Sequence, residues 1–185
     1  MDVKLKLATI DNIDEVLCLH YRYQIDSINE EDKADGFITT AFTKAHLTRL
    51  IEVENGLFIA CVNNKIIAYV MAASWDFWSQ WPMFQFMIEN LHDSLDIEQH
   101  ITKENSYQYG PVCVDKIFRG QGVFESIFNF SLQEMSKRYP IMVTFINKVN
   151  LRSYEAHTKK TSLKVISCFE FNSNHYFKLA CTTTK

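Results

Sequence analysis

Residues 119–124 read RGQGVF, and this stretch holds two of the five glycines in a chain of 185 residues. Glycine is the usual residue where the backbone takes a positive φ or closely approaches a ligand. The preceding residues 106–114 form a run typical of a buried strand, and the residues after Gly122 have helical spacing. A strand, a glycine-containing turn and a helix place free backbone N–H groups at the carboxyl end of the strand. The stretch therefore predicts either an ordinary tight turn or a nest of N–H groups for an anion.

Two common nucleotide-binding motifs do not fit this turn. A dinucleotide-binding loop needs a third glycine, and a P-loop needs Gly-Lys-Ser/Thr; neither pattern is present here. Composition and spacing leave the plain turn and the anion site both open.

The elements before the turn are predicted in the order strand, helix, helix and hairpin. Residues 3–8 alternate as a half-buried strand does, and Thr9 or Asp11 can cap the first helix. The apolar face of that helix consists of Ile13, Val16, Leu17 and His20. His20 on this face is expected to be a core residue, and residues 21–40 are predicted to form a loop. The second helix is capped by Thr43, and the runs 57–62 and 65–74 form a hairpin around Asn63 and Asn64.

The elements after the turn are predicted as a helix, a buried strand, a second helix and a closing hairpin. Residues 141–147 form the strand, and Asn150 caps the following helix through about Lys160. We expect one mixed α/β (α+β) domain spanning residues 1–185.

Residues 75–105 contain all three tryptophans and are predicted to be an aromatic-rich inserted segment. Pro82 suits the first turn of a helix there. The segment is either a small satellite core or the wall of an acceptor pocket. Carboxylates at Asp76, Glu89 and Asp93 would favour a positively charged acceptor.

Composition narrows the partners and the compartment. The formal net charge is −3 with scattered Lys and Arg residues, which argues against nucleic acid or an anionic membrane as the main partner. The five cysteines are odd in number and lack a C-x-x-C pair, so we expect reduced core residues. No apolar run approaches a membrane span, and a soluble cytoplasmic protein is expected.

The ordered set of elements resembles the GNAT N-acetyltransferases. In that family a strand ending in Val-x-x-x-x-Arg runs into Arg/Gln-x-x-Gly-x-Gly/Ala, whose backbone amides cradle the pyrophosphate of acetyl-CoA. Residues 114–124 follow this pattern, with Phe124 where the family has a small residue. The resemblance implies a central mixed, mostly antiparallel twisted sheet, flanked by helices and splayed at the strand ending near Val114. It also implies acetyl-CoA as acyl donor, no metal, and the acetyl-CoA-binding residues Cys113, Val114, Arg119, Gly120, Gln121, Gly122, Val123, Phe124, Asn150 and Ser153.

A second stretch, NLRSYEAHTKKTSL, resembles the family's Asn-x-x-Ala/Ser helix that leads to a tyrosine and then Gly-Phe. Asn150 and Ser153 fit the first two positions. The family's tyrosine, which protonates the departing CoA thiolate, falls on His157 counting forward and on Thr158 counting backward. We prefer His157, whose ordinary pKa of about 6.5 suits proton donation near neutrality. Tyr154 is a second candidate donor, one helical turn earlier.

The resemblance implies direct attack of a primary amine, from a small molecule or a peptide, on the acetyl thioester in a ternary complex. The backbone N–H of Cys113 or Val114 would polarise the thioester carbonyl, and the Cys113 thiol is expected to be packed and inert. The general base is open among Tyr109, Glu104 and Tyr107, and a partly neutral amine needs none.

Two further classes stay open at this stage. Phe124 and the missing tyrosine favour the first, a non-catalytic regulatory domain that binds acyl-CoA. The second is an interaction domain that does not bind the cofactor. The exposed aromatic residues leave open whether the chain forms a homodimer.

Overall fold

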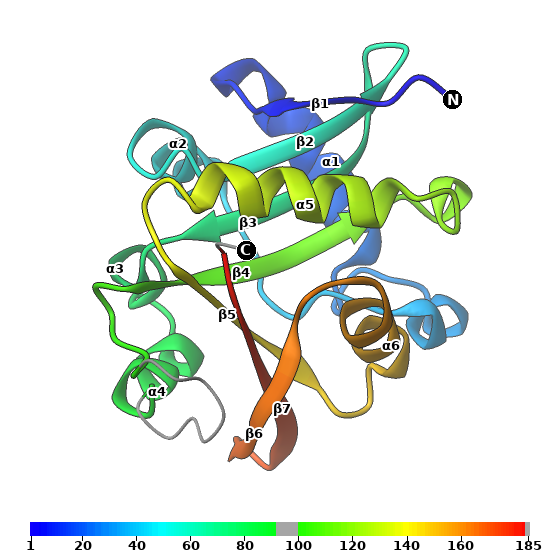
Figure 1. Cartoon of the computed structure of the whole chain (residues 1–185). Helices are drawn as coiled ribbons and strands as arrows, with labels where there is room; N and C mark the ends of the chain where they lie inside the picture. The colour runs from blue at the N-terminus through cyan, green and yellow to red at the C-terminus, as the bar shows by residue number, and fades with distance from the viewer. Residues whose placement is uncertain (92–99, 184–185) are drawn as a thin grey trace. The chain divides into compact units, whose positions relative to one another are not determined.

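The computed structural model describes residues 1–91 and 100–183 as a mixed α/β structure (Figure 1). The strands are β1 (Lys4–Leu7), β2 (Leu57–Val62), β3 (Lys65–Ala73), β4 (Ser106–Val114), β5 (Ile141–Asn147), β6 (Lys164–Phe171) and β7 (Asn174–Thr182). The α-helices are α1 (Ile13–Tyr23), α2 (Lys44–Glu52), α3 (Trp75–Trp78), α4 (Pro82–Glu89), α5 (Val123–Met135) and α6 (Leu151–Lys160). Short 3-10 helices are η1 (Ile10–Asn12), η2 (Glu30–Asp35) and η3 (Lys116–Phe118). The seven strands have the order β1-β2-β3-β4-β5-β7-β6, and the mostly antiparallel sheet confirms the predicted fold class.

The chain divides into two compact units, and β4 contributes residues to both. The first unit comprises Met1–Ala72 and Gly110–Ser131, and the second comprises Ala73–Tyr109 and Leu132–Lys185. The single domain over residues 1–185, with its insertion at residues 75–105, stays a prediction.

In the first unit, antiparallel strands support the helix that follows the glycine turn. The β2–β3 hairpin turns at Asn63 and Asn64, whose φ values of 49° and 63° are those that the sequence predicted for a two-residue turn. Helix α5 packs on this part of the sheet through Phe130, whose ring centroid lies 5.8 Å from that of Phe58 in β2. This contact holds the helix against the strands of its own unit.

The first two helices differ from the prediction mainly at their ends. Thr43 caps α2 by accepting a hydrogen bond from the His46 N–H at 3.3 Å, as predicted. Thr9 instead begins η1, where its N–H donates to Asn12 Oδ1 at 2.9 Å. Helix α1 continues to Tyr23, so the loop predicted for residues 21–40 begins inside the helix and also contains η2. The helix extends because the Tyr23 side chain is buried in contacts with residues far along the chain.

His20 is a core residue, as the sequence predicted. Its ring is fully buried on α1, and Nδ1 lies 2.7 Å from the Tyr69 hydroxyl of β3. Burial lowers the pKa of His20 to about 4, so its imidazole is neutral near pH 7.

In the second unit, β5 is paired on both sides over only part of its length. It pairs with β7 along the whole strand, from Ile141↔Thr182 to Asn147↔Tyr176. Its parallel pairing with β4 covers Ser106↔Ile141 to Gln108↔Val143. The stretch of β4 that pairs with β5 thus ends two residues before Gly110. The closing hairpin turns at Asn172 and Ser173, with φ values of 48° and 60°.

The aromatic segment is mostly a satellite core of the second unit. Trp75, Phe77 and Trp78 are fully buried, and the Trp75 indole N–H donates to Ser106 Oγ at 2.9 Å. Pro82 opens α4, as predicted. These facts favour the structural interpretation for the segment, while Asp93 lies outside the described residues.

The cysteine prediction is only partly correct. Cys61, Cys113 and Cys181 are buried free thiols, but Cys18 and Cys168 are exposed, because each lies on the outer face of an amphipathic element. Over the described residues, no helix combines the length and apolar character that a membrane span requires.

Candidate functional site

The turn between β4 and α5 has the backbone conformation expected of an anion nest. Gly120 and Gly122 have φ values of 76° and 79°, in the left-handed region that favours glycine. A Cβ at either position would meet no described atom within 4 Å. The positive φ, and not crowding, is therefore what requires glycine here, and the space beside each Cα is open.

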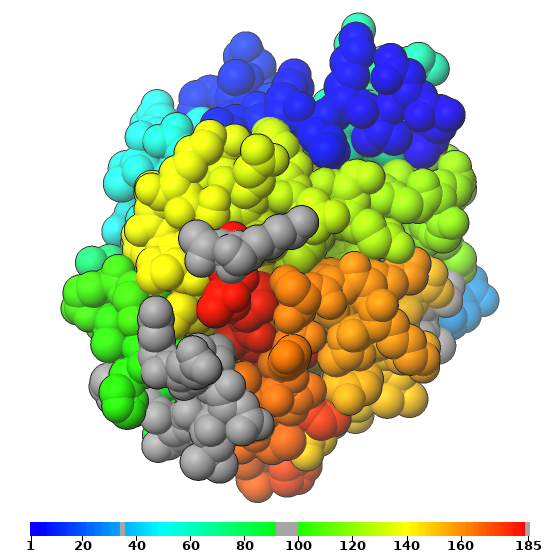
Figure 2. Space-filling model, in the orientation of Figure 1, coloured from blue at the N-terminus to red at the C-terminus, as the bar shows by residue number. Residues whose placement is uncertain are grey.

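The N–H groups of this turn are available to a ligand. Within residues 1–91 and 100–183, the backbone N–H groups of Gly120, Gln121 and Gly122 make no hydrogen bond of normal geometry to a protein acceptor. Val123 begins α5, a helix of 13 residues, and the first amides of a helix lack intrahelical acceptors. Figure 2 shows the yellow-green segment containing the turn at the surface. Successive N–H groups at the positive end of a helix dipole suit a phosphate or pyrophosphate.

Phe124 does not fill this turn. Its partly buried ring lies 6.3 Å from that of Phe128, one turn further along α5. The contact accommodates the bulky side chain along the helix, which leaves the turn compatible with a phosphate group.

Arg119 and Cys113 use their side chains within the protein. Arg119 Nε donates to the carbonyl oxygen of Val114 at 2.8 Å, and its guanidinium carbon lies 4.8 Å from the centroid of the Tyr23 ring. Burial raises the pKa of the Cys113 thiol to about 12. The thiol is therefore protonated near neutrality and is unsuited to nucleophilic attack. The predicted roles of the Cys113 and Val114 N–H groups stay predictions.

The second stretch of the predicted site forms α6, which begins as the sequence indicated. Asn150 caps the helix by accepting a hydrogen bond from the Ser153 N–H at 3.1 Å. The Ser153 hydroxyl lies 3.3 Å from His157 Nδ1, one turn later. The two residues that fit the family pattern therefore shape the first turn of α6.

His157 is buried, and this limits its chemistry. It is 4% exposed, and burial lowers its pKa to about 4. Its Nδ1 lies 2.7 Å from the Ser153 carbonyl oxygen, which can only accept, so Nδ1 carries the proton. Its ring meets that of Tyr109 edge-on at 5.7 Å. A neutral imidazole buried against an aromatic ring is a poor proton donor near pH 7, which weighs against the preferred role of His157.

Tyr154 is the more accessible candidate on the same helix. Its ring is partly exposed and packs on Phe177 of β7 at a centroid distance of 4.6 Å. Thr158 is the other residue that aligns with the family's tyrosine. Its hydroxyl donates a hydrogen bond to the Tyr154 carbonyl oxygen at 2.8 Å. Of these three side chains, Tyr154 combines partial exposure with an ionisable O–H group.

The candidate bases differ sharply in their surroundings. Tyr109 and Tyr107 are fully buried, and burial raises the pKa of each phenol well above its ordinary value. Neither phenol can act as a base near neutrality. Glu104 is exposed, and hydrogen bonds from its own N–H and from Thr102 lower its pKa. It lies in the turn before β4, two residues before the first residue of that strand, Ser106.

The structure divides the predicted site residues between the two units. The first unit holds Cys113, Val114, Arg119, Gly120, Gln121, Gly122, Val123 and Phe124, and the second holds Glu104, Tyr109, Asn150, Ser153, Tyr154 and His157. Within the second unit, Tyr109 and His157 are in contact, and Glu104 lies at the amino end of β4.

Sequence reasoning missed the contacts of the segment that leads into the glycine turn, above all those of Asp115 and Tyr23. A carboxylate directly after a buried strand was a usable signal for Asp115. Its partner Arg22 lies 93 positions earlier, at 2.6 Å in space, and no local pattern indicates that pairing.

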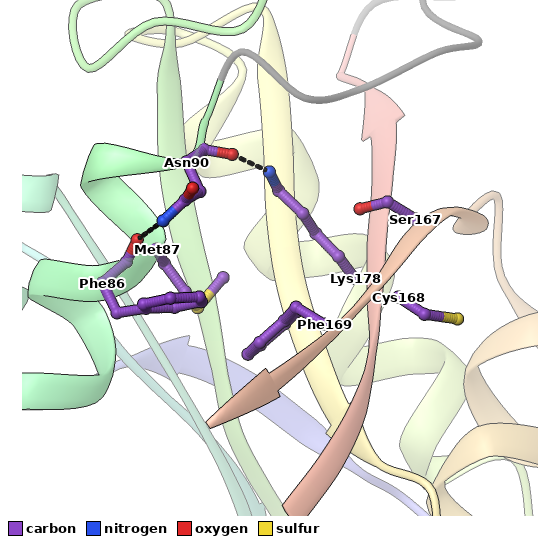
Figure 3. A pocket seen from close by; sticks show the side chains of 7 residues that line it. All are labelled: Phe86, Met87, Asn90, Ser167, Cys168, Phe169 and Lys178. Atoms are coloured by element: carbon purple, nitrogen blue, oxygen red, sulfur yellow. Dashed lines mark hydrogen bonds between the residues drawn. The ribbon is translucent and has the colours of Figure 1, made fainter. Parts of the chain in front are cut away.

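A separate hollow of about 250 Å³ lies in the second unit, between α4 and the β6–β7 hairpin (Figure 3). It is lined by Phe86, Met87, Asn90, Ser167, Cys168, Phe169 and Lys178. Lys178 is 3% exposed, and its Nζ donates to the Asn90 carbonyl oxygen at 2.5 Å. A cation is favourable there because Asn90 caps the negative end of α4. Lys178 is the only charged side chain among these seven, so the hollow is unsuited to a protonated amine.

Comparisons with known proteins identify the fold. No protein-family model matches the chain, and no curated protein matches its sequence. The ribosomal-protein-S18-alanine N-acetyltransferase from Escherichia coli is similar in structure, with a TM-score of 0.65, 7% identity, and coverage of 100% of this chain and 96% of that one. A GNAT-family acetyltransferase from Streptococcus pneumoniae has a TM-score of 0.63 and 9% identity, over 98% of this chain and 99% of that one.

A putative acetyltransferase from Salmonella typhimurium, solved with its cofactor acetyl-CoA, has a TM-score of 0.65 and 10% identity, over 99% of this chain and 95% of that one. Among the described residues, no group of three or more His, Cys, Asp and Glu side chains is placed to hold a metal ion. At these identities the similarity establishes the fold. The chain has the mixed α/β fold of the GNAT-family acetyltransferases.

Proposed function

We propose that this protein is an acetyl-CoA-dependent N-acetyltransferase that acetylates a primary amine by direct attack in a ternary complex. The observation that carries the proposal is the turn after β4, where two left-handed glycines and three available N–H groups precede α5. A pyrophosphate fits this donor set, because backbone amides bind phosphate oxygens without a specific side chain. The fold shared with acetyltransferases agrees with this interpretation.

In the proposed reaction, the turn anchors the donor and α6 provides a proton. The N–H groups of Gly120, Gln121 and Gly122 bind the pyrophosphate, and the N-terminus of α5 adds its dipole. When bound, acetyl-CoA supplies an activated acetyl thioester. The Tyr154 hydroxyl holds the proton that the leaving sulfur requires. The Cys113 thiol takes no part, because burial keeps it protonated.

The acceptor attacks as a neutral amine; its nitrogen loses one proton to solvent as the amide forms and the C–S bond breaks, while Tyr154 protonates the thiolate. Burial raises the pKa of Tyr107 and of Tyr109, so both phenols keep their protons near neutrality. Neither can therefore take a proton from the amine. A small-molecule amine or a peptide N-terminus meets these conditions. The E. coli neighbour is named for its action on an alanine of ribosomal protein S18, which agrees with a protein or peptide acceptor.

Calorimetric titration with acetyl-CoA, CoA and 3′-dephospho-CoA tests donor binding without an acceptor. We expect dissociation constants in the micromolar range, which correspond to a binding free energy on the order of −8 kcal/mol. Retained binding of 3′-dephospho-CoA would mean that the 3′-phosphate contributes little and that most of the affinity comes from the pyrophosphate and the rest of the molecule. No detectable binding of any of the three at millimolar concentration would overturn the proposal.

A second candidate function is a regulatory domain that binds acyl-CoA without turnover. The burial of His157 and its pKa of about 4 favour it, because they remove the sequence's preferred proton donor. Release of free thiol from acetyl-CoA, measured with a panel of small amines and of peptides with free N-termini, separates the two functions. Amine-dependent thiol release supports the enzyme, and binding without release from any amine supports the regulator.

A further inference from the structure

Tyr23, the last residue of α1, is bonded to the segment that leads into the glycine turn. Its hydroxyl accepts a hydrogen bond from the Lys116 N–H at 2.8 Å and donates one to Asp115 Oδ1 at 3.2 Å. These partners lie 93 and 92 positions away in the sequence. Burial raises the pKa of Tyr23, so the hydroxyl keeps its proton for this bond. One phenol thus joins two consecutive residues just after β4.

Asp115 ties this contact to the strand and to η3. Its carboxylate is buried, at 4% exposure of the residue, and Oδ2 lies 2.6 Å from Arg22 Nη1. Its backbone N–H donates to the Ile67 carbonyl oxygen at 2.8 Å, and its own carbonyl accepts from the Phe118 N–H at 2.9 Å. A buried carboxylate is stable only where it is paired and hydrogen-bonded. Both the side chain and the backbone of Asp115 are therefore held in place directly before η3.

Arg119 continues the same arrangement up to the first glycine. Its guanidinium lies over the Tyr23 ring, with the central carbon 4.8 Å from the centroid. Its Nε bonds back to the Val114 carbonyl oxygen at 2.8 Å. The stacking and the hydrogen bond hold the residue directly before Gly120, so Tyr23 contacts the turn segment through both its hydroxyl and its ring.

We propose that Tyr23 is a positioning residue for the anion-binding turn, acting through Asp115, Lys116 and Arg119. This inference rests on the proposed function. A nest of N–H groups binds an anion tightly only when its backbone is already ordered, because ordering it on binding consumes part of the affinity. The Tyr23 hydroxyl orders the start of the segment and its ring orders the end. Tyr23 acts through the segment before the turn, so its loss weakens donor binding and not the chemical step.

Tyr23→Phe tests the hydroxyl while keeping the ring under Arg119. We expect the dissociation constant for acetyl-CoA to rise about tenfold and kcat at saturating donor to stay within about twofold of wild type. Tyr21→Phe is the matched control on the same helix. It makes the same chemical change, and the lost hydroxyl bonds the Phe42 carbonyl oxygen at 2.6 Å, away from the turn. We expect it to leave acetyl-CoA affinity unchanged.

A second variant, Arg22→Gln, leaves Tyr23 in place and removes the ion pair with Asp115 at a side chain that is about half exposed. We expect a smaller loss of affinity, about threefold. The three variants should share the wild-type thermal unfolding temperature to within a few degrees, so that an affinity change reports on the turn.

The outcomes separate this inference from the function on which it rests. Wild-type protein that does not bind acetyl-CoA overturns both. Wild-type binding with unchanged affinity in Tyr23→Phe overturns the positioning role alone. Equal weakening by Tyr21→Phe and Tyr23→Phe also overturns it, because a general loosening of α1 would then be the cause. A fall in kcat with unchanged affinity would do the same.

Discussion

The glycine turn and α6 contain the two stretches that the sequence assigned to one site, and they offer different kinds of chemistry. The turn offers backbone N–H groups at the surface of the first unit. Helix α6 offers side chains of the second unit, and among them His157 is buried with a pKa of about 4 while Tyr154 is partly exposed. A site made from the backbone depends mainly on φ angles, whereas a side-chain site depends on what surrounds each group. The motif therefore supports a binding role for the turn more strongly than any catalytic role for a residue of α6.

The largest expected effect concerns the turn itself. Gly122→Glu places a side chain at φ 79° and a carboxylate beside the proposed pyrophosphate. We expect acetyl-CoA affinity to fall about 100-fold, or about 3 kcal/mol, from strain of about 1–2 kcal/mol and like-charge repulsion. Calorimetry measures the loss.

Two control variants separate those causes. Gly122→Ala adds the strain alone. Gln121→Glu adds a charge beside the turn and also removes the hydrogen bond that Gln121 Nε2 donates to the Ile117 carbonyl oxygen at 3.0 Å. Each should weaken binding about tenfold. Affinity that survives Gly122→Glu would contradict an anion site at this turn.

The next effect tests the proton donor on α6. Tyr154→Phe should lower kcat roughly 100-fold, because it removes a general acid, and should leave the dissociation constant for acetyl-CoA unchanged. His157→Phe is the comparison within the same helix, and we expect its kcat to stay within about threefold of wild type. Steady-state thiol release measures both variants. The reverse pattern would return His157 to the mechanism.

A pH effect on stability tests the burial of His157. Its pKa is about 4 in the folded protein and about 6.5 as the ordinary value, so the folded state resists protonation. The stabilisation is fully present above about pH 6.5 and is lost as the pH falls toward 4. Between about pH 7.5 and pH 5, the loss amounts to about 2 kcal/mol of unfolding free energy for this residue.

Urea unfolding at the two pH values measures the loss of unfolding free energy. In His157→Phe, the part of this loss that His157 causes should be absent. His20→Phe supplies the comparison in the first unit, since burial also lowers the pKa of His20 to about 4. The two variants should show similar reductions in pH dependence. An unchanged pH dependence in His157→Phe would mean that its imidazole is accessible to protons.

The smallest effect compares two helix caps. Asn150→Ala removes the oxygen that accepts from the Ser153 N–H, and Thr43→Ala removes the corresponding cap of α2. Each should cost about 1 kcal/mol of unfolding free energy. If Asn150 belongs to the donor site, only Asn150→Ala should also weaken acetyl-CoA binding. Equal donor affinity in both variants would leave Asn150 with a capping role alone.

Features that depend on a few neighbouring residues were predictable from the sequence. Asn63-Asn64 indicated the β2–β3 hairpin, Asn150 indicated the start of α6, and residues 141–147 were predicted as the strand that the structure shows as β5. The left-handed φ of Gly120 and Gly122 belongs to the same group, because glycine relieves a steric penalty within its own residue.

The surroundings of each side chain required the tertiary structure. Residues 21–40 were predicted as a loop, yet Tyr23 is helical because its phenol meets Asp115 and Lys116 across more than 90 positions. Cys18 is exposed although it was expected in the core.

His157 shows the same limit at the candidate site. Its ordinary pKa suggested a proton donor, and burial against Tyr109 lowers that pKa to about 4. Local sequence thus determined turn geometry, caps and the order of elements along the chain, because torsion angles and short-range hydrogen bonds depend on adjacent residues. Burial, ion pairing and the protonation of side chains were decided only when distant segments packed together, because a group's desolvation depends on every atom that surrounds it.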